Sequence, residues 1–171
     1  REGFDEVAIA TGVVPRPLKI EGSEAPQVLS YAQVLRGAPV GRKVAVIGAG
    51  GIGFDVSEFL LKPEHQPQPQ PLAEWQREWG VDPNPNYVTE GGMSAPEVHP
   101  PIREIYLLQR KSTSVGAGLG KTSGWVHRAS LKKHGVRMMR GVQYQRITPE
   151  GLWITIDGQA QLLRVDTIVV C

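Results

Sequence analysis

Apolar residues gather in short runs that polar and glycine-rich stretches separate. Residues 43–47 read KVAVI and residues 105–108 read IYLL, with no polar residue at every second position. A short unbroken apolar run between turn signals is typical of a strand buried on both faces, as in a parallel sheet. We therefore predict parallel strands at residues 43–47, 104–109 and 136–139.

The apolar spacing changes to a helical period directly after the first of these strands. From residue 51 to residue 61, apolar side chains recur three or four positions apart with polar residues between them, which predicts an amphipathic helix. A second helix is expected to begin near residue 122 or 123 and to end before Gly135, because glycine is a common C-terminal stop. The alternation of strand and helix predicts an α/β fold.

The pattern of the last third of the chain is typical of β-strands. Apolar-containing runs at residues 142–147, 152–156 and 161–165 are separated by Pro149-Glu150-Gly151 and by Asp157-Gly158. These separators are turn signals for β-hairpins. We therefore predict an antiparallel three-stranded β-meander after the parallel strands.

Residues 62–101 contain nine of the fourteen prolines and interrupt this pattern. Such a density of proline is incompatible with a long helix or a central strand, so we interpret the segment as an insertion. Within it, helical spacing at residues 72–79 places Trp75 and Trp79 on one face, where they are expected to pack, with docking on the main body as one possibility.

A glycine-rich turn follows the first buried strand and opens the first helix. Its residues are Gly48, Ala49, Gly50, Gly51, Ile52 and Gly53, which match the pattern G-x-G-x-x-G. In this setting the glycines allow a tight turn, a close approach of backbone to pyrophosphate, and close packing of helix on strand. The helix N-terminus then receives the phosphates. We predict a Rossmann-like, FAD/NAD(P)-binding three-layer domain with a parallel sheet and the β-meander.

The residues at the end of the second strand usually determine whether a Rossmann domain binds NADH or NADPH. An acidic residue there would accept the ribose hydroxyls of NAD, but this chain has Arg110 and Lys111 instead. Two cations suit the 2′-phosphate of NADPH through charge-assisted hydrogen bonds. The alternative is that both are solvated loop residues without a ligand.

The overall charge is nearly balanced, with 19 lysines and arginines against 17 aspartates and glutamates. Neither nucleic acid nor a membrane is therefore expected as a partner. The single cysteine, Cys171, rules out an internal disulfide and fits a cytoplasmic location. His127 and His134 lack further ligands for a metal site, and no nucleophile stands with a base. We expect no catalytic side chain and no metal in this chain.

The N-terminal residues resemble part of another domain. Residues 4–12, followed by Ile20-Glu21-Gly22, are similar to the return strand of the FAD domain in flavoproteins that bind two dinucleotides. The resemblance implies that residues 1–40 are the C-terminal strand of an FAD domain with a linker, and that Thr11 and Gly12 contribute to cofactor binding. Residues 41–165 would be the NAD(P)H-binding domain, and residues 166–171 a return strand toward the FAD domain.

A narrower resemblance covers most of the chain outside the proline-rich insertion. Residues 28–31, 46–55, 78–82, 108–111 and 118–128 are similar to bacterial NADPH-dependent 2,4-dienoyl-CoA reductases. In that family NADPH reduces FAD, and electrons pass through a 4Fe-4S cluster to FMN on a TIM barrel, where a dienoyl-CoA of fatty acid β-oxidation is reduced. The resemblance implies that the remaining FAD and FMN/TIM-barrel domains of the same polypeptide are the partners of this chain.

Two other functions stay open at this point. One is a related flavin oxidoreductase that uses NADH on another substrate. The other is a structural module, because trimethylamine-dehydrogenase-like relatives keep the equivalent domain as an ADP-binding, non-reducing module, in which the glycine pattern serves assembly only.

Overall fold

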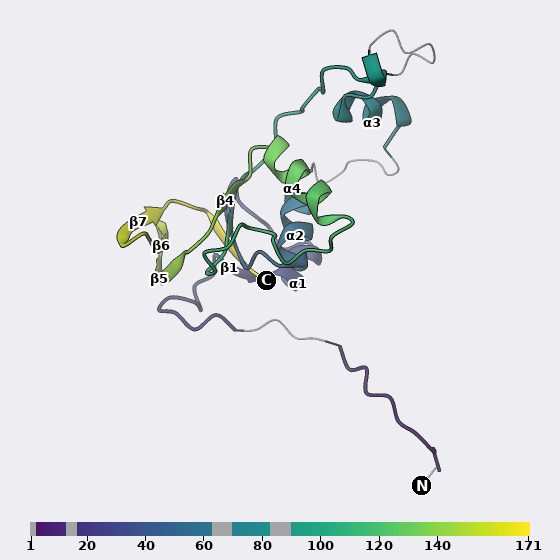
Figure 1. The fold of residues 1–171 in the computed structure, drawn as a ribbon. Helices are drawn as coiled ribbons and strands as arrows, with labels where there is room; N and C mark the ends of the chain where they lie inside the picture. Colours follow the sequence, from purple (N-terminus) through teal and green to yellow (C-terminus); the bar gives the residue numbers. More distant parts are fainter. Residues whose placement is uncertain (1–2, 13–16, 63–69, 83–89) are drawn as a thin grey trace.

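A five-stranded parallel sheet forms the centre of the molecule (Figure 1). The computed structural model describes residues 3–12, 17–62, 70–82 and 90–171. The order of the strands is β1-β8-β2-β3-β4, and every neighbouring pair is parallel. Their bounds are β1 (Val28–Ser30), β2 (Lys43–Ile47), β3 (Glu104–Leu108), β4 (Arg137–Met139) and β8 (Thr167–Val170). The strands predicted at residues 43–47, 104–109 and 136–139 are confirmed as β2, β3 and β4.

Different layers cover the two faces of this sheet. Along β2, Val44 and Val46 belong to one buried cluster, whereas Ala45 and Ile47 belong to another. The first cluster includes side chains of the helices α1 (Tyr31–Leu35), α2 (Gly51–Leu61) and α4 (Gly124–Lys133). The second includes side chains of the antiparallel strands β5 (Gln143–Thr148), β6 (Gly151–Ile156) and β7 (Gln159–Leu163). Burial on both faces explains why β2 is an unbroken apolar run.

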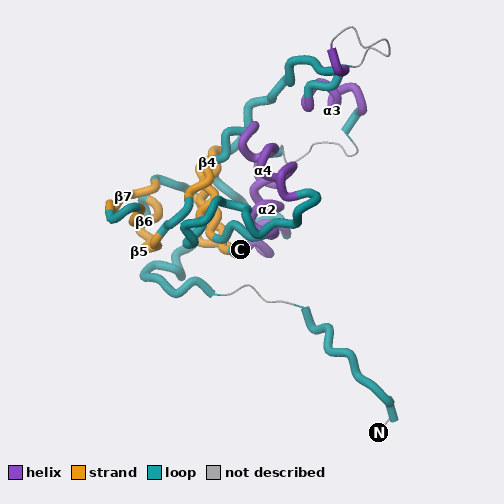
Figure 2. Tube along the Cα trace, in the orientation of Figure 1, coloured by secondary structure: helices purple, strands orange, loops and turns teal. Residues whose placement is uncertain are grey.

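The three layers are separate in space, with helices on one side of the central sheet and the small sheet on the other (Figure 2). This arrangement confirms the predicted Rossmann-like, FAD/NAD(P)-binding fold. The predicted meander is confirmed as well: Asp157 has a φ of +50° and Gly158 a φ of +78° between β6 and β7. Positive φ at both central residues is what a two-residue hairpin turn with Asp-Gly requires.

Helix α2 has the bounds that its apolar spacing predicts. Phe54, Val56 and Leu60 are at most 2% exposed and belong to the core cluster on the helical side of the sheet. The buried hydroxyl of Ser57 donates to the carbonyl oxygen of Gly53 at 2.7 Å, so this polar group is satisfied within the helix. Burial of this apolar face, rather than intrinsic propensity, holds the helix in place.

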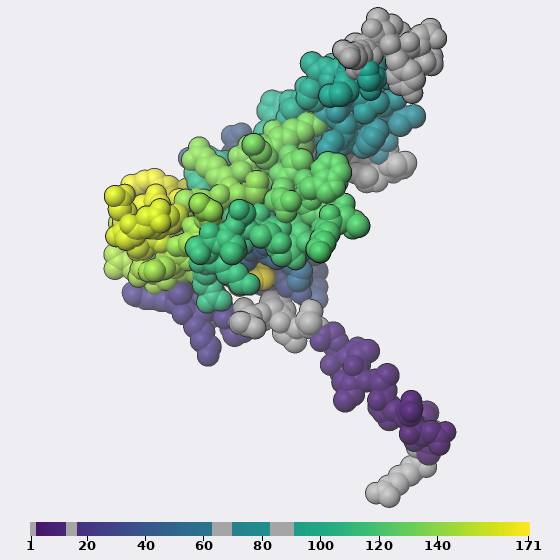
Figure 3. Space-filling view, in the orientation of Figure 1, coloured from purple at the N-terminus to yellow at the C-terminus, as the bar shows by residue number. Residues whose placement is uncertain are grey.

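The strand that the resemblance implies within residues 4–12 is not formed. Residues 3–12 run without strand pairing and lead away from the main body, as the purple segment in Figure 3 shows. Val7 is 78% exposed and Ile9 is 86% exposed. A strand needs a neighbour that pairs with its N–H and C=O groups, and the described part of the chain provides none here.

The segment interpreted as a linker contains two elements, β1 and α1. Ser30 is the N-cap of α1, and its hydroxyl oxygen accepts from the backbone N–H of Gln33 at 3.3 Å. The side-chain oxygen of Gln33 in turn accepts from the N–H of Ser30 at 2.8 Å. This reciprocal pair is a capping box, and the spacing Ser-x-x-Gln in the sequence was the signal for it.

The sheet extends beyond the range 41–165 expected for the nucleotide-binding domain. Strand β8 lies between β1 and β2, with Ala45 opposite Ile168 and Leu29 opposite Val169. Thr167–Val170 is therefore part of the same core, since Ile168 and Val169 are fully buried. That residues 166–171 also lead toward an FAD domain stays a prediction.

Part of the proline-rich insertion contacts the end of helix α4. Helix α3 (Leu72–Trp79) has the predicted bounds, and a short 3-10 turn, η1, spans Glu90–Gly92. The ring centroids of Trp75 and Trp79 lie 6.5 Å apart, and Lys133 Nζ lies 4.8 Å from the centroid of Trp79. Lys133 Nζ also donates to the carbonyl oxygen of Glu78. The expected docking of the insertion is thus made by Trp79, whereas Trp75 stays 44% exposed.

Candidate functional site

The turn between β2 and α2 begins with a backbone conformation that favours glycine. Gly48 has a φ of +109°, and a Cβ placed there would lie 2.7 Å from the carbonyl oxygen of Cys171. The N–H of Gly48 donates to the carbonyl oxygen of Leu108 in β3 at 3.1 Å. The chain therefore turns out of the sheet while still bonded to the neighbouring strand, which only glycine allows without strain.

Gly53 permits the close packing of helix α2 on this turn. A Cβ at residue 53 would overlap the carbonyl oxygen of Gly48 and would lie 2.9 Å from its carbonyl carbon. It would also lie 3.4 Å from Leu107 Cδ1. The third glycine of the pattern is therefore required by packing, as the sequence predicts.

Gly50 and Gly51 border open space instead. A Cβ at either position would have no atom within 4 Å in the described structure. Gly50 is the N-cap of α2 and gives it no side-chain hydrogen bond, and Ile52 in the first turn is 40% exposed. The first N–H groups of a helix have no acceptor within the helix, and the helix dipole makes this end positive. These residues fit a pyrophosphate, which needs exposed N–H donors and room for close backbone approach.

Ala49 is neither crowded like Gly48 and Gly53 nor open like Gly50 and Gly51. It is partly buried and packs against the core cluster under the helices. Its contribution to a ligand can only come from its backbone, which the turn holds at the carboxyl edge of the sheet.

Arg110 and Lys111 lie at the same edge of the sheet as the glycine turn. Ile47 and Leu108, the last residues of β2 and β3, are paired in register, so the two loops that follow them start side by side. Gln109 holds the second loop, because its side-chain amide donates to the carbonyl oxygens of Lys111 at 3.1 Å and Thr113 at 2.8 Å. The side chains of Arg110 and Lys111 are exposed, and no ion pair among the described residues involves them.

Tyr144 of β5 lies close enough to Arg110 for the positive charge of Arg110 to affect the pKa of its phenol. Burial raises the pKa of Tyr144 to about 12, while the positive charge of Arg110 acts in the opposite direction. The phenol is therefore neutral at physiological pH and contributes no charge that would compete with an anionic ligand for Arg110.

The stability of the protein is expected to fall as the pH rises from about 10 to about 12. Tyr144 has a folded pKa of about 12, above its ordinary value of 10.0, so it ionises first in the unfolded chain. The stabilisation is present below pH 10 and is lost through this window, by up to roughly 3 kcal/mol for two pKa units. Urea unfolding at pH 9 and pH 11.5 measures the fall, which should be smaller in Tyr144→Phe. An equal fall in both proteins would contradict this role of Tyr144.

Thr11 and Gly12 are not brought to the glycine turn. They end the exposed segment 3–12, which Figure 1 shows leading away from helix α2 and the main body. A Cβ at Gly12 would have nothing within 4 Å. Their role in cofactor binding stays a prediction.

The described residues contain no group of three histidine, cysteine, aspartate or glutamate residues that could hold a metal ion. None of their helices is both long and apolar enough to cross a bilayer. Burial raises the pKa of the Cys171 thiol to about 12, so it stays protonated and is a poor nucleophile at neutral pH.

One feature of this region was not predicted from the sequence. A pocket of about 470 Å³ lies between α4 and β4, close to the loop that carries Arg110 and Lys111. Arg128 and Lys132 point to it from one face of α4, and their spacing of four residues was the signal that could have indicated a shared face. The third cation, Arg140, comes from the loop after β4 and could not be placed without the fold.

Comparison with solved structures agrees with the fold. A 2-naphthoyl-CoA reductase in complex with 2-naphthoyl-CoA has a TM-score of 0.66 and 20% identity, over 95% of this chain and 19% of that chain. A 6-hydroxypseudooxynicotine amine oxidase from Pseudomonas geniculata has a TM-score of 0.59 and 16% identity, over 92% and 19%. This chain thus spans about a fifth of the length of these two proteins.

A third structure is bound to a nucleotide. It is an engineered water-forming NADPH oxidase bound to NADPH, a mutant of the NADH oxidase from Lactobacillus brevis. Its TM-score is 0.54 and its identity 17%, over 99% of this chain and 31% of that chain.

The family is shown by the sequence as a whole. The profile of the family described as pyridine nucleotide-disulphide oxidoreductase matches residues 2–171. Together with the glycine turn on a Rossmann-like sheet, this match means that the chain belongs to the pyridine nucleotide-disulphide oxidoreductase family.

Proposed function

We propose that this chain is the NADPH-binding part of a multidomain, flavin-dependent oxidoreductase. The observation that carries the proposal is the glycine turn, in which Gly53 is required by packing while Gly50 and Gly51 face open space. A turn that served packing alone would have no reason to leave the N-terminus of α2 without a cap and open to a ligand.

The charge at the end of β3 supports NADPH over NADH. Arg110 and Lys111 are exposed cations beside the glycine turn, where an acidic residue would accept the ribose of NADH. The engineered NADPH oxidase shows the same change in charge, because its five substitutions remove one aspartate and add two arginines. A 2′-phosphate would meet two positive side chains here that have no other ion-pair partner in the described structure.

Binding places the nucleotide along the carboxyl edge of the sheet. The N–H groups at the start of α2 would hold the pyrophosphate, and the cations after β3 would hold the adenosine end. When bound, FAD supplies the redox chemistry by accepting a hydride from the nicotinamide ring. In this proposal the chain orients the nucleotide for that transfer.

We further propose that the parent protein is a 2,4-dienoyl-CoA reductase that acts in fatty acid β-oxidation and contains FAD, FMN and a 4Fe-4S cluster. The motifs at residues 46–55, 108–111 and 118–128 support this substrate class through their resemblance to that family. The similarity to a reductase crystallised with 2-naphthoyl-CoA also supports an acyl-CoA thioester as the substrate. The FAD and FMN/TIM-barrel domains of the same polypeptide would be its partners.

The exposed N-terminal segment fits such a partner. Phe4, Val7 and Ile9 are all more than 70% exposed, which is costly for apolar side chains unless another surface covers them. The extended backbone of residues 3–12 is free to pair as a strand. An FAD domain that takes up this segment would supply both the missing strand neighbour and the apolar contact.

Calorimetric titration with NADPH and NADH tests the nucleotide preference. Replacing both Arg110 and Lys111 with alanine is expected to weaken NADPH binding about 10-fold or more, because a charged hydrogen bond contributes about 1.5–3 kcal/mol. NADH binding should stay within about 2-fold, since NADH has no 2′-phosphate. Arg42→Ala is the matched control, because Arg42 precedes β2 at the opposite edge of the sheet. An equal loss for both nucleotides would contradict the assignment.

A further inference from the structure

The charged residues are divided unevenly between the proline-rich insertion and the rest of the chain. Residues 63–101, directly after helix α2, contain six acidic residues and one arginine. The remaining residues contain 11 acidic and 18 basic side chains. The insertion is therefore negative and the main body positive, so the charges of two separate copies are complementary.

Helix α3 presents an apolar stripe that is exposed at its outer end. Leu72, Trp75 and Trp79 recur at helical spacing on one face of the helix. Trp79 packs beside Lys133 of α4, whereas Leu72 is 69% exposed and Trp75 is 44% exposed. Glu74 lies between these two and forms no ion pair with a residue that the structure describes. We call Leu72, Glu74 and Trp75 the insertion face.

Backbone hydrogen bonds hold the insertion face in place. The N–H of Ser94 donates to the carbonyl oxygen of Gly80 at 2.8 Å, and the N–H of Glu97 donates to that of Arg77 at 2.9 Å. Gly80 ends α3 with a φ of +68°, and a Cβ there would lie 2.6 Å from the carbonyl oxygen of Ser94. The returning segment thus packs closely against the end of α3, so this face needs little ordering before it binds another surface.

A complementary surface lies at the C-terminal end of α2. Phe59 is 51% exposed, and Lys62, the C-cap of the helix, is exposed as well. Arg103 Nη1 donates to the carbonyl oxygen of Leu60 at 3.1 Å, which brings a second positive charge to this end. We call Phe59, Lys62 and Arg103 the helix-end face. It combines an exposed aromatic ring with positive charge, whereas the insertion face combines apolar side chains with negative charge.

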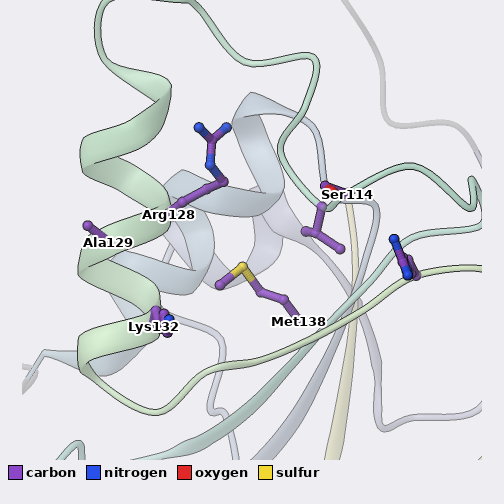
Figure 4. A pocket seen from close by; sticks show the side chains of 7 residues that line it. Ser114, Arg128, Ala129, Lys132 and Met138 are labelled. Atoms are coloured by element: carbon purple, nitrogen blue, oxygen red, sulfur yellow. The ribbon is translucent and has the colours of Figure 1, made fainter.

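The helix-end face lies away from the nucleotide site. The glycine turn opens α2 at the carboxyl edge of the sheet, whereas the insertion leaves from the other end of α2 and projects from the main body (Figure 1). The other basic surface is the pocket between α4 and β4, where Figure 4 shows Arg128 close to Met138. That pocket adjoins the loop of Arg110 and Lys111, where the nucleotide is proposed to bind. The helix-end face therefore remains accessible when the nucleotide is bound.

We propose that two copies of this chain associate reciprocally, with the insertion face of each copy on the helix-end face of the other. Both faces belong to the same end of one copy, so a two-fold axis can bring each face against its complement and close a dimer. In each contact the apolar residues of the insertion face would cover Phe59, and Glu74 would lie beside Lys62. Within one copy the two faces do not meet, because Trp79 and Lys133 hold α3 on α4.

Sedimentation velocity over a range of protein concentrations measures this association. We expect a monomer–dimer equilibrium that shifts toward the monomer as the salt concentration rises, because salt screens contacts between charges. Trp75→Ala is expected to weaken dimerisation about 10-fold or more, because tryptophan at the centre of an interface contributes much of the binding energy. The side chain is largely outside the core, and circular dichroism checks that the fold is kept.

An exchange of charges tests which faces meet. Glu74→Lys and Lys62→Glu are each expected to weaken dimerisation about 10-fold, because each places like charges opposite one another. A chain that carries both substitutions should regain dimerisation, and so should an equal mixture of the two single variants, because opposite charges then face each other in both contacts. The matched control is Gln161→Lys, which adds the same charge as Glu74→Lys to an exposed position on β7 and should leave dimerisation unchanged.

A protein that stays monomeric at every concentration would overturn the proposal. Dimerisation that Trp75→Ala leaves unchanged would overturn it as well, and so would a charge exchange that fails to restore a dimer lost in the single variants. The inference is independent of the proposed function, because neither face belongs to the glycine turn. Titration of each variant with NADPH should therefore give the affinity of the unmodified protein, whether or not the variant dimerises.

Discussion

Replacing Gly53 with alanine is expected to destabilise the protein by about 3 kcal/mol or more. The added Cβ would overlap the carbonyl oxygen of Gly48, which is backbone and cannot move aside like a flexible side chain. Helix α2 would have to shift away from the sheet, where Phe54 and Leu60 are buried. Urea unfolding measures the loss of stability directly.

Gly51→Ala is the matched control for that substitution. Gly51 is the first residue of the same helix, and a Cβ there meets no atom within 4 Å. Alanine restricts the unfolded chain more than glycine does, so stability should rise slightly, by up to about 1 kcal/mol. If Gly53→Ala were as stable as Gly51→Ala, the conclusion that α2 packs too closely on the turn for a Cβ at residue 53 would be wrong.

Gly50→Val is expected to weaken nucleotide binding strongly while leaving the fold nearly unchanged. Gly50 has φ −85° and ψ −172°, an extended conformation that valine adopts readily, and its surroundings are open. The loss of stability should be no more than about 1 kcal/mol. In the complex, however, the side chain would occupy the space through which the backbone approaches the pyrophosphate.

The loss should affect both nucleotides alike, because NADPH and NADH share the pyrophosphate. We expect each affinity to fall by about 100-fold or more, which is about 2.7 kcal/mol. This outcome differs from that of the Arg110 and Lys111 variant, which affects NADPH alone. Titration of the Gly50→Val protein with both nucleotides checks it, and undiminished binding would show that the pyrophosphate does not lie against this turn.

Elements that depend on local pattern could be predicted from the sequence. Strand β2 and helices α2 and α3 have the predicted bounds, because their apolar spacing reflects which faces are buried. The hairpin at Asp157-Gly158 was predictable because positive φ at two successive positions strongly favours that residue pair.

Elements that depend on distant partners could not be predicted in the same way. The run at residues 6–10 has a strand-like composition, but no strand forms there because the described chain offers it no neighbour. Conversely, β1 has only three residues and gains its place by pairing with β8, about 140 residues later in the chain. Pairing over such a separation leaves no local signal in the sequence.

The candidate site also has a part that local pattern predicts and a part that depends on residues distant in the sequence. The glycine turn and the pair Arg110 and Lys111 could be proposed from motif and strand order, because the parallel arrangement of β2 and β3 brings their carboxyl ends together. The basic pocket could not, because Arg128 and Arg140 come from a helix and a loop that meet only in the folded structure.

Titration of the unmodified protein with NADPH, NADH and ADP at one fixed salt concentration tests whether the glycine turn and the cations after β3 bind NADPH. Salt must be constant because it screens the contact between phosphate and cations. We expect NADPH to bind about 10-fold or more tightly than both NADH and ADP, since only NADPH carries the 2′-phosphate that the basic residues after β3 are expected to hold. Equal binding of ADP and NADPH, or binding of none of the three, would contradict the claim that this glycine turn is an NADPH site.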